Sequence, residues 1–177
     1  KNFSTSGEDF LEKTTQYLLQ KGALSKSPYV TLPDHTEFVQ QKGYRSSIGL
    51  FGQKRAFTTV EVAYIYQAIE SNTTGIKLMT GFAQAAKKKE VKEYFSRGKD
   101  LSKKIVSTLN GVLLNSDINS SASSAGHVTN STETPFSDKL MLYNTNLLSS
   151  FSLGSNALGS SFSLRNDLPR HMAIFAK

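Results

Sequence analysis

The chain of 177 residues contains no cysteine. Disulfide bonds, thiolate chemistry and zinc sites built from cysteine are therefore excluded. The chain has three histidines, and none of them stands three residues after a glutamate. That Glu-x-x-His spacing places two ligands on one face of a helix and is typical of carboxylate-bridged metal sites in helical bundles. We therefore expect no metal and no other cofactor.

Long apolar runs are missing as well. No stretch approaches the roughly 20 residues that a membrane-spanning helix needs, and the first residues lack the apolar segment of a signal peptide. The nucleophile motif Gly-x-Ser-x-Gly and the phosphate-binding motif Gly-x-x-x-x-Gly-Lys-Ser/Thr do not occur. The sequence therefore predicts an intracellular protein without a membrane span, and no motif in it indicates an enzyme.

What the sequence does contain is a long amphipathic stretch that predicts two helices joined by a short turn. Apolar residues recur at helical spacing over residues 59–86 and again over 89–114. Thr58 and Glu61 have the spacing of a capping box, which favours a helix start at this point. Because the break between the two helices is so short, we expect an antiparallel hairpin. The predicted inward-facing residues are Val62, Ile65, Tyr66, Ile69, Ile76, Met79 and Ala83, followed by Val91, Tyr94, Phe95, Leu101, Ile105, Leu109 and Val112.

Two polar residues, Asn72 and Thr73, fall on the apolar stripe of the first of these helices. A buried asparagine must be hydrogen-bonded, so the pair is a candidate polar core site for a ligand. The alternative is a satisfied polar pair that fixes the helix register. Three glycines, Gly75, Gly81 and Gly98, lie inside the helices, where each costs about 1 kcal/mol relative to alanine. We expect them to permit close approach between helices.

Three further helices are predicted, over residues 7–22, 137–164 and 167–177. Ser6 and Gly22 are the expected N-cap and C-terminal residues of the first. Its predicted inner face comprises Phe10, Leu11, Thr14, Tyr17 and Leu18. The stretch 137–164 should place on one face Leu140, Leu147, Phe151, Gly154, Leu158 and Phe162. Its alternation of serine with phenylalanine and leucine leaves a strand as the alternative.

Two long connections complete the predicted layout. An extended N-terminal arm covers residues 23–57 and contains two prolines and three glycines. A second connection, residues 116–135, is rich in serine, asparagine and threonine. Since it can span the length of the preceding helix, the helix at 137–164 is free to run parallel or antiparallel to the one at 89–114.

The positive charge of the chain is concentrated in one place. Residues 87–104 contain eight basic and three acidic residues, which gives +5 of the net charge of +7. A candidate anion-binding surface therefore comprises Lys87, Lys88, Lys89, Lys92 and Arg97. The spacing of Lys89 from Glu93 equally fits an ion pair on a solvated helix face, so nucleic acid is not the partner that we expect.

Several blocks of the sequence resemble one bacterial family. The main ones are Gly81-Phe82-Ala83-Gln84 with Lys89-Glu90-Val91, Tyr94-Phe95-Ser96-Arg97-Gly98-Lys99, and Pro135-Phe136-Ser137-Asp138-Lys139-Leu140-Met141. Lys54-Arg55-Ala56-Phe57-Thr58 and Ser163-Leu164-Arg165-Asn166-Asp167-Leu168 fit the same pattern. The chain thereby resembles a family from spore-forming bacilli labelled as spore coat proteins. The resemblance implies a ferritin-like helical bundle, sometimes present as tandem copies, with no established activity.

Together these features predict an all-α protein with a single domain over residues 1–177. The expected architecture is a ferritin-like up-and-down four-helix bundle with an extended N-terminal arm and a short C-terminal helix. We expect a non-enzymatic structural or interaction protein associated with the bacterial spore, with the spore coat as one location and with coat proteins or further copies of itself as partners. Two alternatives stay open: a ferritin-like protein that binds a metal or small ligand, and an anion or nucleic-acid binder acting through residues 87–104.

Overall fold

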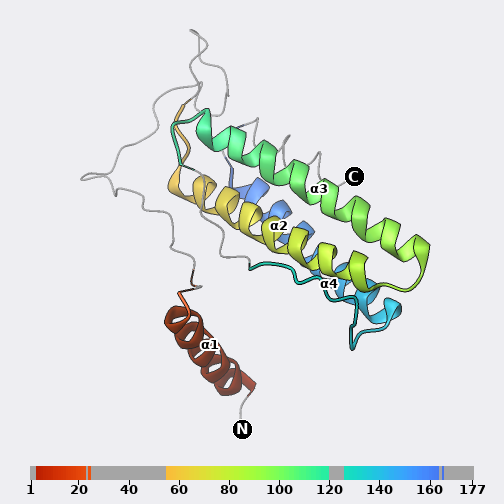
Figure 1. The fold of residues 1–177 in the computed structure, drawn as a ribbon. Coiled ribbons are helices and arrows are strands. Elements are labelled where there is room, and N and C mark those ends of the chain that lie inside the picture. Colours follow the sequence, from red (N-terminus) through yellow and green to blue (C-terminus); the bar gives the residue numbers. More distant parts are fainter. Residues whose placement is uncertain (1–2, 23, 25–54, 120–125, 164, 166–177) are drawn as a thin grey trace.

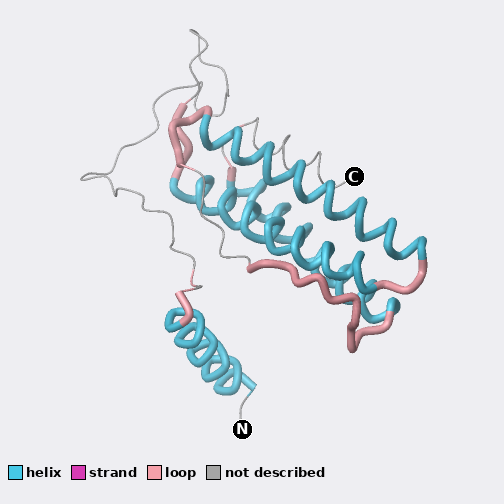
Figure 2. Tube along the Cα trace, viewed as in Figure 1, coloured by secondary structure: helices cyan, strands magenta, loops and turns pink. Residues whose placement is uncertain are grey.

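The computed structural model describes residues 3–22, 24, 55–119, 126–163 and 165. Over these residues the chain forms four helices and no strand (Figures 1 and 2). They are α1 (Phe3–Gln20), α2 (Thr59–Ala85), α3 (Lys89–Leu114) and α4 (Asp138–Phe162). The predicted all-α class is confirmed, and the strand alternative for residues 137–164 is wrong. Most of the predicted arm and the predicted helix at 167–177 lie outside the described residues.

The α2–α3 hairpin forms the centre of the molecule. The predicted capping box is present, because Glu61 N–H donates to Thr58 Oγ1 at 3.3 Å and Thr58 N–H donates to the Glu61 carboxylate at 2.9 Å. Two hydrophobic clusters hold the helices together, one towards each end of the hairpin. The first contains Ile65, Ala68, Ile69, Ile105, Leu109 and Leu113. The second contains Phe82, Ala86, Val91 and Phe95, together with Met141 from α4.

The buried stripe of α3 differs from the predicted one at three positions, one of which is Val112, which is half-buried while Leu113 is buried. Tyr94 and Leu101 are exposed, and Ser102 is buried in the seam with α2 instead. The seam is narrow here, because a Cβ atom at Gly98 would collide with Met79 Sδ and one at Gly75 would lie 3.7 Å from Ser102 Oγ. The small side chain of Ser102 therefore fits into the seam, where the helical spacing predicted the larger side chain of Leu101. The close approach expected at Gly98 is confirmed, whereas a Cβ at Gly81 would meet only Val128 of the following connection.

The third packed helix, α4, runs antiparallel to α2 and hence in the same direction as α3 (Figure 1). Its first residue, Asp138, is hydrogen-bonded to the turn between α2 and α3, and the residue after its last turn, Ser163, reaches the start of α2. The connection from α3 must therefore cross the length of the bundle. Its described residues contact α2 at two places: the Tyr66 hydroxyl donates to the Asn119 carbonyl, and Val128 lies near Gly81.

The face that α4 turns towards α2 is not the predicted one. Met141, Thr145 and Gly159 are buried, and a Cβ atom at Gly159 would come within 2.8 Å of Tyr64 Cδ1. Small residues are thus required where the aromatic ring of α2 lies. The predicted inner stripe is exposed instead, at Leu140, Leu147, Phe151, Leu158 and Phe162. At its C-terminal end the Phe162 ring, although exposed, stacks on the Tyr64 ring of α2 with 6.1 Å between the ring centres.

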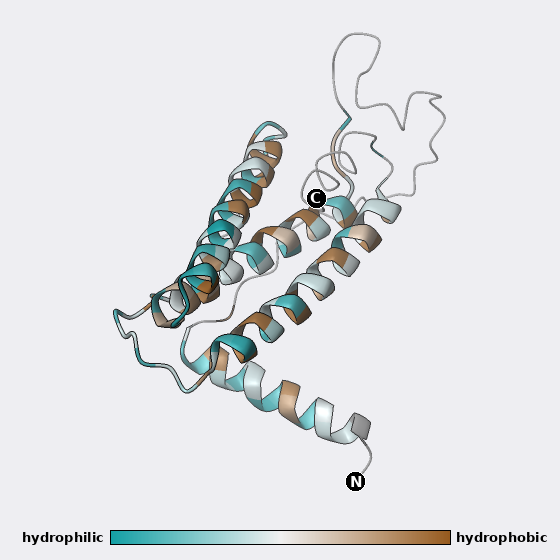
Figure 3. Cartoon of the chain, turned by 90° about the vertical axis from the view of Figure 1, so that its right-hand side faces the viewer, coloured by the Kyte–Doolittle hydropathy of each residue, from teal (hydrophilic) through white to brown (hydrophobic). Residues whose placement is uncertain are grey.

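The first helix, α1, stands apart from this three-helix core (Figure 1). It begins at Phe3 and continues through Ser6, so the predicted N-cap at Ser6 is wrong. Gly22 follows its end with φ +63°, the left-handed conformation that favours glycine. The predicted inner face does not point into a core, since Phe10, Leu11 and Tyr17 are exposed. The hydropathy colouring nevertheless alternates along all the described helices, α1 included, as amphipathic helices require (Figure 3).

Candidate functional site

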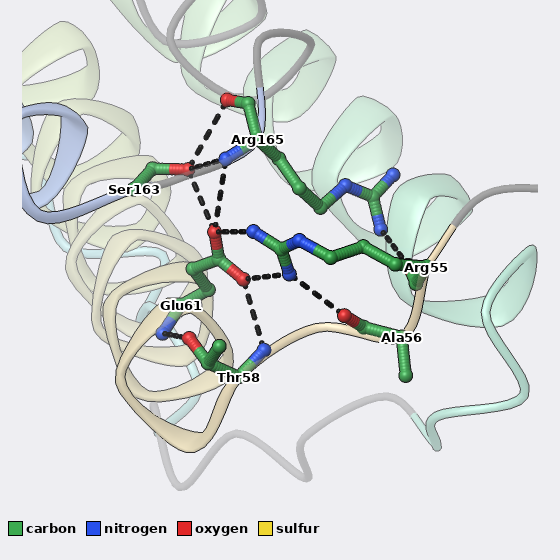
Figure 4. A network of polar contacts seen from close by, with 6 residues as sticks. All are labelled: Arg55, Ala56, Thr58, Glu61, Ser163 and Arg165. Atoms are coloured by element: carbon green, nitrogen blue, oxygen red, sulfur yellow. Dashed lines mark hydrogen bonds and ion pairs between the residues drawn. The ribbon is translucent and has the colours of Figure 1, made fainter. Parts of the chain in front are cut away.

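A buried carboxylate joins the start of α2 to the end of α4 (Figure 4). The Glu61 side chain is 1% exposed and accepts hydrogen bonds from two segments that lie about a hundred residues apart in sequence. Arg55 donates to both of its oxygens, at 2.8 and 2.9 Å. The Ser163 hydroxyl and the Arg165 N–H donate to Oε1, at 2.9 and 3.3 Å. We refer to these residues, Arg55, Thr58, Glu61, Ser163 and Arg165, as the Glu61 clasp.

Hydrogen bonding controls the charge of Glu61. Burial by itself would raise the pKa of this carboxyl, but the Arg55 guanidinium, the Thr58 N–H and the Ser163 hydroxyl together lower the pKa to about 2. The carboxylate is therefore ionised at neutral pH and saturated with donors. A general acid or base needs a pKa near the working pH, so Glu61 has the properties of a structural anchor and not of a catalytic group.

The second arginine of the clasp extends the contact to the segment before α2. The Arg165 guanidinium lies 3.8 Å from the centre of the Phe57 ring and donates to the Arg55 carbonyl at 3.0 Å. Cation–π contacts of this kind are strongest where water is excluded, and Arg165 is buried. The clasp thus fastens residues 55–61 to residues 163–165 through charge, hydrogen bonds and ring contact.

A second polar contact closes the opposite end of the bundle. The Asp138 carboxylate accepts hydrogen bonds from the Lys87 and Lys88 backbone N–H groups, both at 2.9 Å. These N–H groups stand at the N-terminus of α3, which has no capping side chain of its own. The two N–H groups and the nearby lysine charges lower the pKa of Asp138 below its usual value. One carboxylate from α4 therefore caps α3 and fixes the turn.

The two polar residues singled out on α2 bond to their own helix. Asn72 Nδ2 donates to the Ala68 carbonyl and Thr73 Oγ1 to the Ile69 carbonyl, each at 2.8 Å. Both side chains are half-buried. Each bond to the carbonyl four residues earlier uses a side-chain donor, namely one N–H of the Asn72 amide and the hydroxyl of Thr73.

The basic residues of the hairpin turn and of α3 are exposed, except Lys99, which is half-buried. Lys89 pairs with Glu93 at 3.9 Å on the helix surface, as the i,i+4 spacing suggested. Lys87, Lys88, Lys92 and Arg97 are also exposed. Lys87, Lys88 and Lys89 lie together at the turn. Asp138 accepts hydrogen bonds from the backbone N–H groups of Lys87 and Lys88 and not from their side chains.

A shallow hollow of about 250 Å³ lies between the C-terminal end of α2 and residues 128–136. Gln84 lines it, and its buried Oε1 atom accepts no hydrogen bond within the described part of the chain. Across the same part, no group of three or more His, Asp or Glu side chains is placed to hold a metal ion. No described helix is long and apolar enough to cross a membrane.

The most unusual surface belongs to α4. Of its ten large apolar or aromatic side chains, eight are exposed and only Met141 is buried. The α4 apolar face, which we define as Leu140, Leu147, Phe151, Leu158 and Phe162, repeats with the spacing of one helix face, and Phe151 is 70% exposed. At 100° per residue this face lies about a third of a turn around the helix from the side that packs on α2.

The fold and these contacts define an all-helical protein in which a hairpin and a crossover helix are fastened at both ends by a carboxylate. The chain belongs to a family described as proteins of unknown function (DUF3231), whose model matches residues 46–177, three quarters of the chain. α1 precedes the matched range. No curated protein and no solved structure matches the chain.

Sequence reasoning did not identify the Glu61 clasp as a site. The capping-box spacing indicated Glu61 as a helix-start residue but gave no sign of partners in α4. The one available signal lay in two blocks of the family resemblance, around Arg55 and around Arg165, which the fold brings together. The apolar stripe of α4 is evident from its spacing in the sequence, which predicts that it faces the interior, whereas the structure exposes it.

Proposed function

We propose that the protein is a non-enzymatic structural or interaction protein associated with the bacterial spore, and that it binds other protein chains through the α4 apolar face. The supporting observation is the exposure of this face. Soluble proteins rarely leave a contiguous apolar patch of this kind uncovered, and such patches usually mark interaction sites. Amphipathic helices bind partners through side chains at this spacing.

The acidic groups described above support a role without catalysis. Glu61 is saturated with hydrogen-bond donors, and Asp138 is engaged by two backbone N–H groups. The association with the spore is supported by the resemblance of the sequence blocks to a family labelled as spore coat proteins. We also propose a ferritin-like architecture, because folds of that class join two parallel helices by one long crossover, as α3 and α4 are joined.

The test combines location with a matched pair of variants. The protein is followed by antibody through growth and sporulation, and spore coat extracts are compared with cytosol. Leu147→Lys combined with Phe151→Glu disrupts the α4 apolar face, whereas Ser149→Lys combined with Ser150→Glu makes the same charge changes at exposed serines of the same helix. We expect the natural protein and the serine variant in the coat fraction and the apolar-face variant in the cytosol. Natural protein confined to the cytosol of growing cells would refute the proposal.

Binding of a small ligand is the second candidate, and one observation favours it. The buried Gln84 Oε1 atom at the hollow beside α2 has no described donor, and a buried acceptor without a partner costs about 1–3 kcal/mol. A ligand carrying an N–H or O–H group would satisfy it. A thermal-shift screen of small amides and alcohols tests this candidate. A ligand that binds here should raise the melting temperature of the natural protein but not that of the control variant Gln84→Leu.

A further inference from the structure

Within the part of the chain that the structure describes, two amphipathic helices have exposed apolar sides. On α4 the exposed side is the α4 apolar face, and on α1 it is formed by Phe10, Leu11 and Tyr17, with Phe10 73% exposed. An isolated helix of 18 residues is only marginally stable in water, because most helical stability in proteins comes from packing an apolar face. α1 therefore requires a partner surface, and α4 offers one.

The charges of the two regions are complementary. α1 carries Glu8, Asp9 and Glu12 against Lys13, a net charge of −2 from three acidic residues and one basic residue. α4 carries one acidic and one basic residue and is neutral. Residues 87–104 of the hairpin carry +5, and Asp138 holds the start of this basic stretch, at Lys87 and Lys88, against the N-terminal end of α4. An acidic amphipathic helix thus suits the α4 apolar face better than a basic one.

The dimensions also agree. α1 is about 27 Å long and the α4 apolar face, from residue 140 to residue 162, about 33 Å, at 1.5 Å per residue. Residues 21–58 connect α1 to α2, and a connection of this length can span up to roughly 120 Å. α1 can therefore reach a neighbouring molecule.

From these observations we infer that the α4 apolar face binds α1 of a second copy of this chain, in a reciprocal exchange that forms a twofold dimer. Over the described residues, each chain exposes one apolar helix side on α1 and one on α4, and a twofold arrangement buries both at once. Exchange of an identical element is a low-cost route to a dimer. The inference rests on the proposed function, since it names the partner of the same face.

The first test measures the mass of the full chain in solution by light scattering over a range of concentrations. The expected mass is twice the 19.4 kDa of one chain. Phe10→Asn combined with Leu11→Asn should raise the dissociation constant at least about a hundredfold, because two large exposed side chains leave the contact. Gln16→Asn combined with Gln20→Asn introduces the same residues on the other side of α1 and should leave the constant within about threefold. Equal effects of the two variants would overturn the inference.

The second test uses the absence of cysteine from the chain. A chain with Leu11→Cys is mixed with a chain with Phe151→Cys and oxidised; both positions lie near the middle of their helices, so the pair reports either orientation. We expect a disulfide between the two chains, and a much weaker one when Leu153→Cys, exposed on another side of α4, replaces Phe151→Cys. A disulfide that forms only within one chain carrying both cysteines would show docking of α1 on its own bundle and would refute the exchange.

Failure of this inference is distinguishable from failure of the proposed function. Suppose that the natural protein is a monomer in solution but that its Leu147→Lys, Phe151→Glu variant no longer enters the spore coat. That result would refute the exchange and would leave the α4 apolar face as an interaction surface. A variant that stays in the coat fraction like the natural protein would refute the proposed function, and the exchange with it.

Discussion

At Glu61, burial and ionisation oppose each other and hydrogen bonding decides the outcome. Burial raises the pKa of a carboxyl that is 1% exposed, yet hydrogen bonds from Arg55, Thr58 and Ser163 hold the pKa of Glu61 at about 2. Removal of one partner from a buried charge pair typically costs about 3–5 kcal/mol, because the remaining charge is left without compensation. Single substitutions in the Glu61 clasp should therefore be far more damaging than substitutions of exposed charges.

We predict that Glu61→Gln lowers the free energy of unfolding by about 3 kcal/mol at pH 7, measured by urea denaturation. The sign of the pH dependence follows from the lowered pKa. The contribution of Glu61 is fully present above its unfolded value of 4.5 and is lost as the pH falls towards about 2. The difference between natural protein and variant should thus shrink between pH 5 and pH 2. Glu8→Gln, at an exposed position of α1, is the control and should change stability by less than about 0.5 kcal/mol.

The two glycines of α4 allow a matched comparison. A Cβ atom at Gly159 would meet the Tyr64 ring at 2.8 Å, whereas one at Gly154 would meet nothing within 4 Å. Gly154→Ala should stabilise the protein by about 0.5–1 kcal/mol through helix propensity. Gly159→Ala should destabilise it by about 1–3 kcal/mol, because overpacking outweighs that gain. Thermal unfolding of the two variants measures the difference, and stabilisation by both would show that α4 does not pack closely on α2.

At the scale of whole elements, α3 depends on α4 for its N-terminal cap. Asp138→Ala should lower the melting temperature, and Asp138→Asn, which keeps one acceptor oxygen, should lower it less. The more direct measurement is hydrogen exchange at the Lys87 and Lys88 amides, which donate to Asp138. The exchange of these two amides should accelerate in both variants. In the natural protein, after correction for the intrinsic pH dependence of amide exchange, it should accelerate as the pH falls through the lowered pKa of Asp138. Asp100→Ala, at an exposed position of α3, should leave both amides protected.

The elements themselves could be predicted from the sequence, but their packing could be predicted only in part. Periodicity and the Thr58–Glu61 spacing are local properties, and both gave the hairpin. The inward face of α4 could not be obtained in this way, because amphipathicity identifies an apolar stripe without saying what covers it. The structure turns Thr145 and Gly159 inward, against the bulk of Tyr64, and leaves Phe151 outside. The clasp joins residues about a hundred positions apart, which no local pattern reports.

At the scale of the whole molecule, stability is unevenly distributed. The α2–α3 seam contains both hydrophobic clusters, whereas α4 adds the buried Met141 and the partly buried Leu142 to the second cluster and nothing to the first. Local opening follows the density of buried apolar contacts. In native-state hydrogen exchange we therefore expect the central amides of α4 to be less protected than those of α2 and α3. Equal protection across the three helices would mean that they open only as one unit.

The parallel direction of α3 and α4 has a consequence for folding during synthesis. A ribosome adds about 5–20 residues per second, so the stretch from the end of α3 to the end of α4 takes roughly 2–10 s to appear. The hairpin, a local structure, can form long before its third helix exists, and the side of α2 around Tyr64 stays in water until then. Chaperones that bind nascent chains would therefore find a binding site on that side of α2 only during those few seconds.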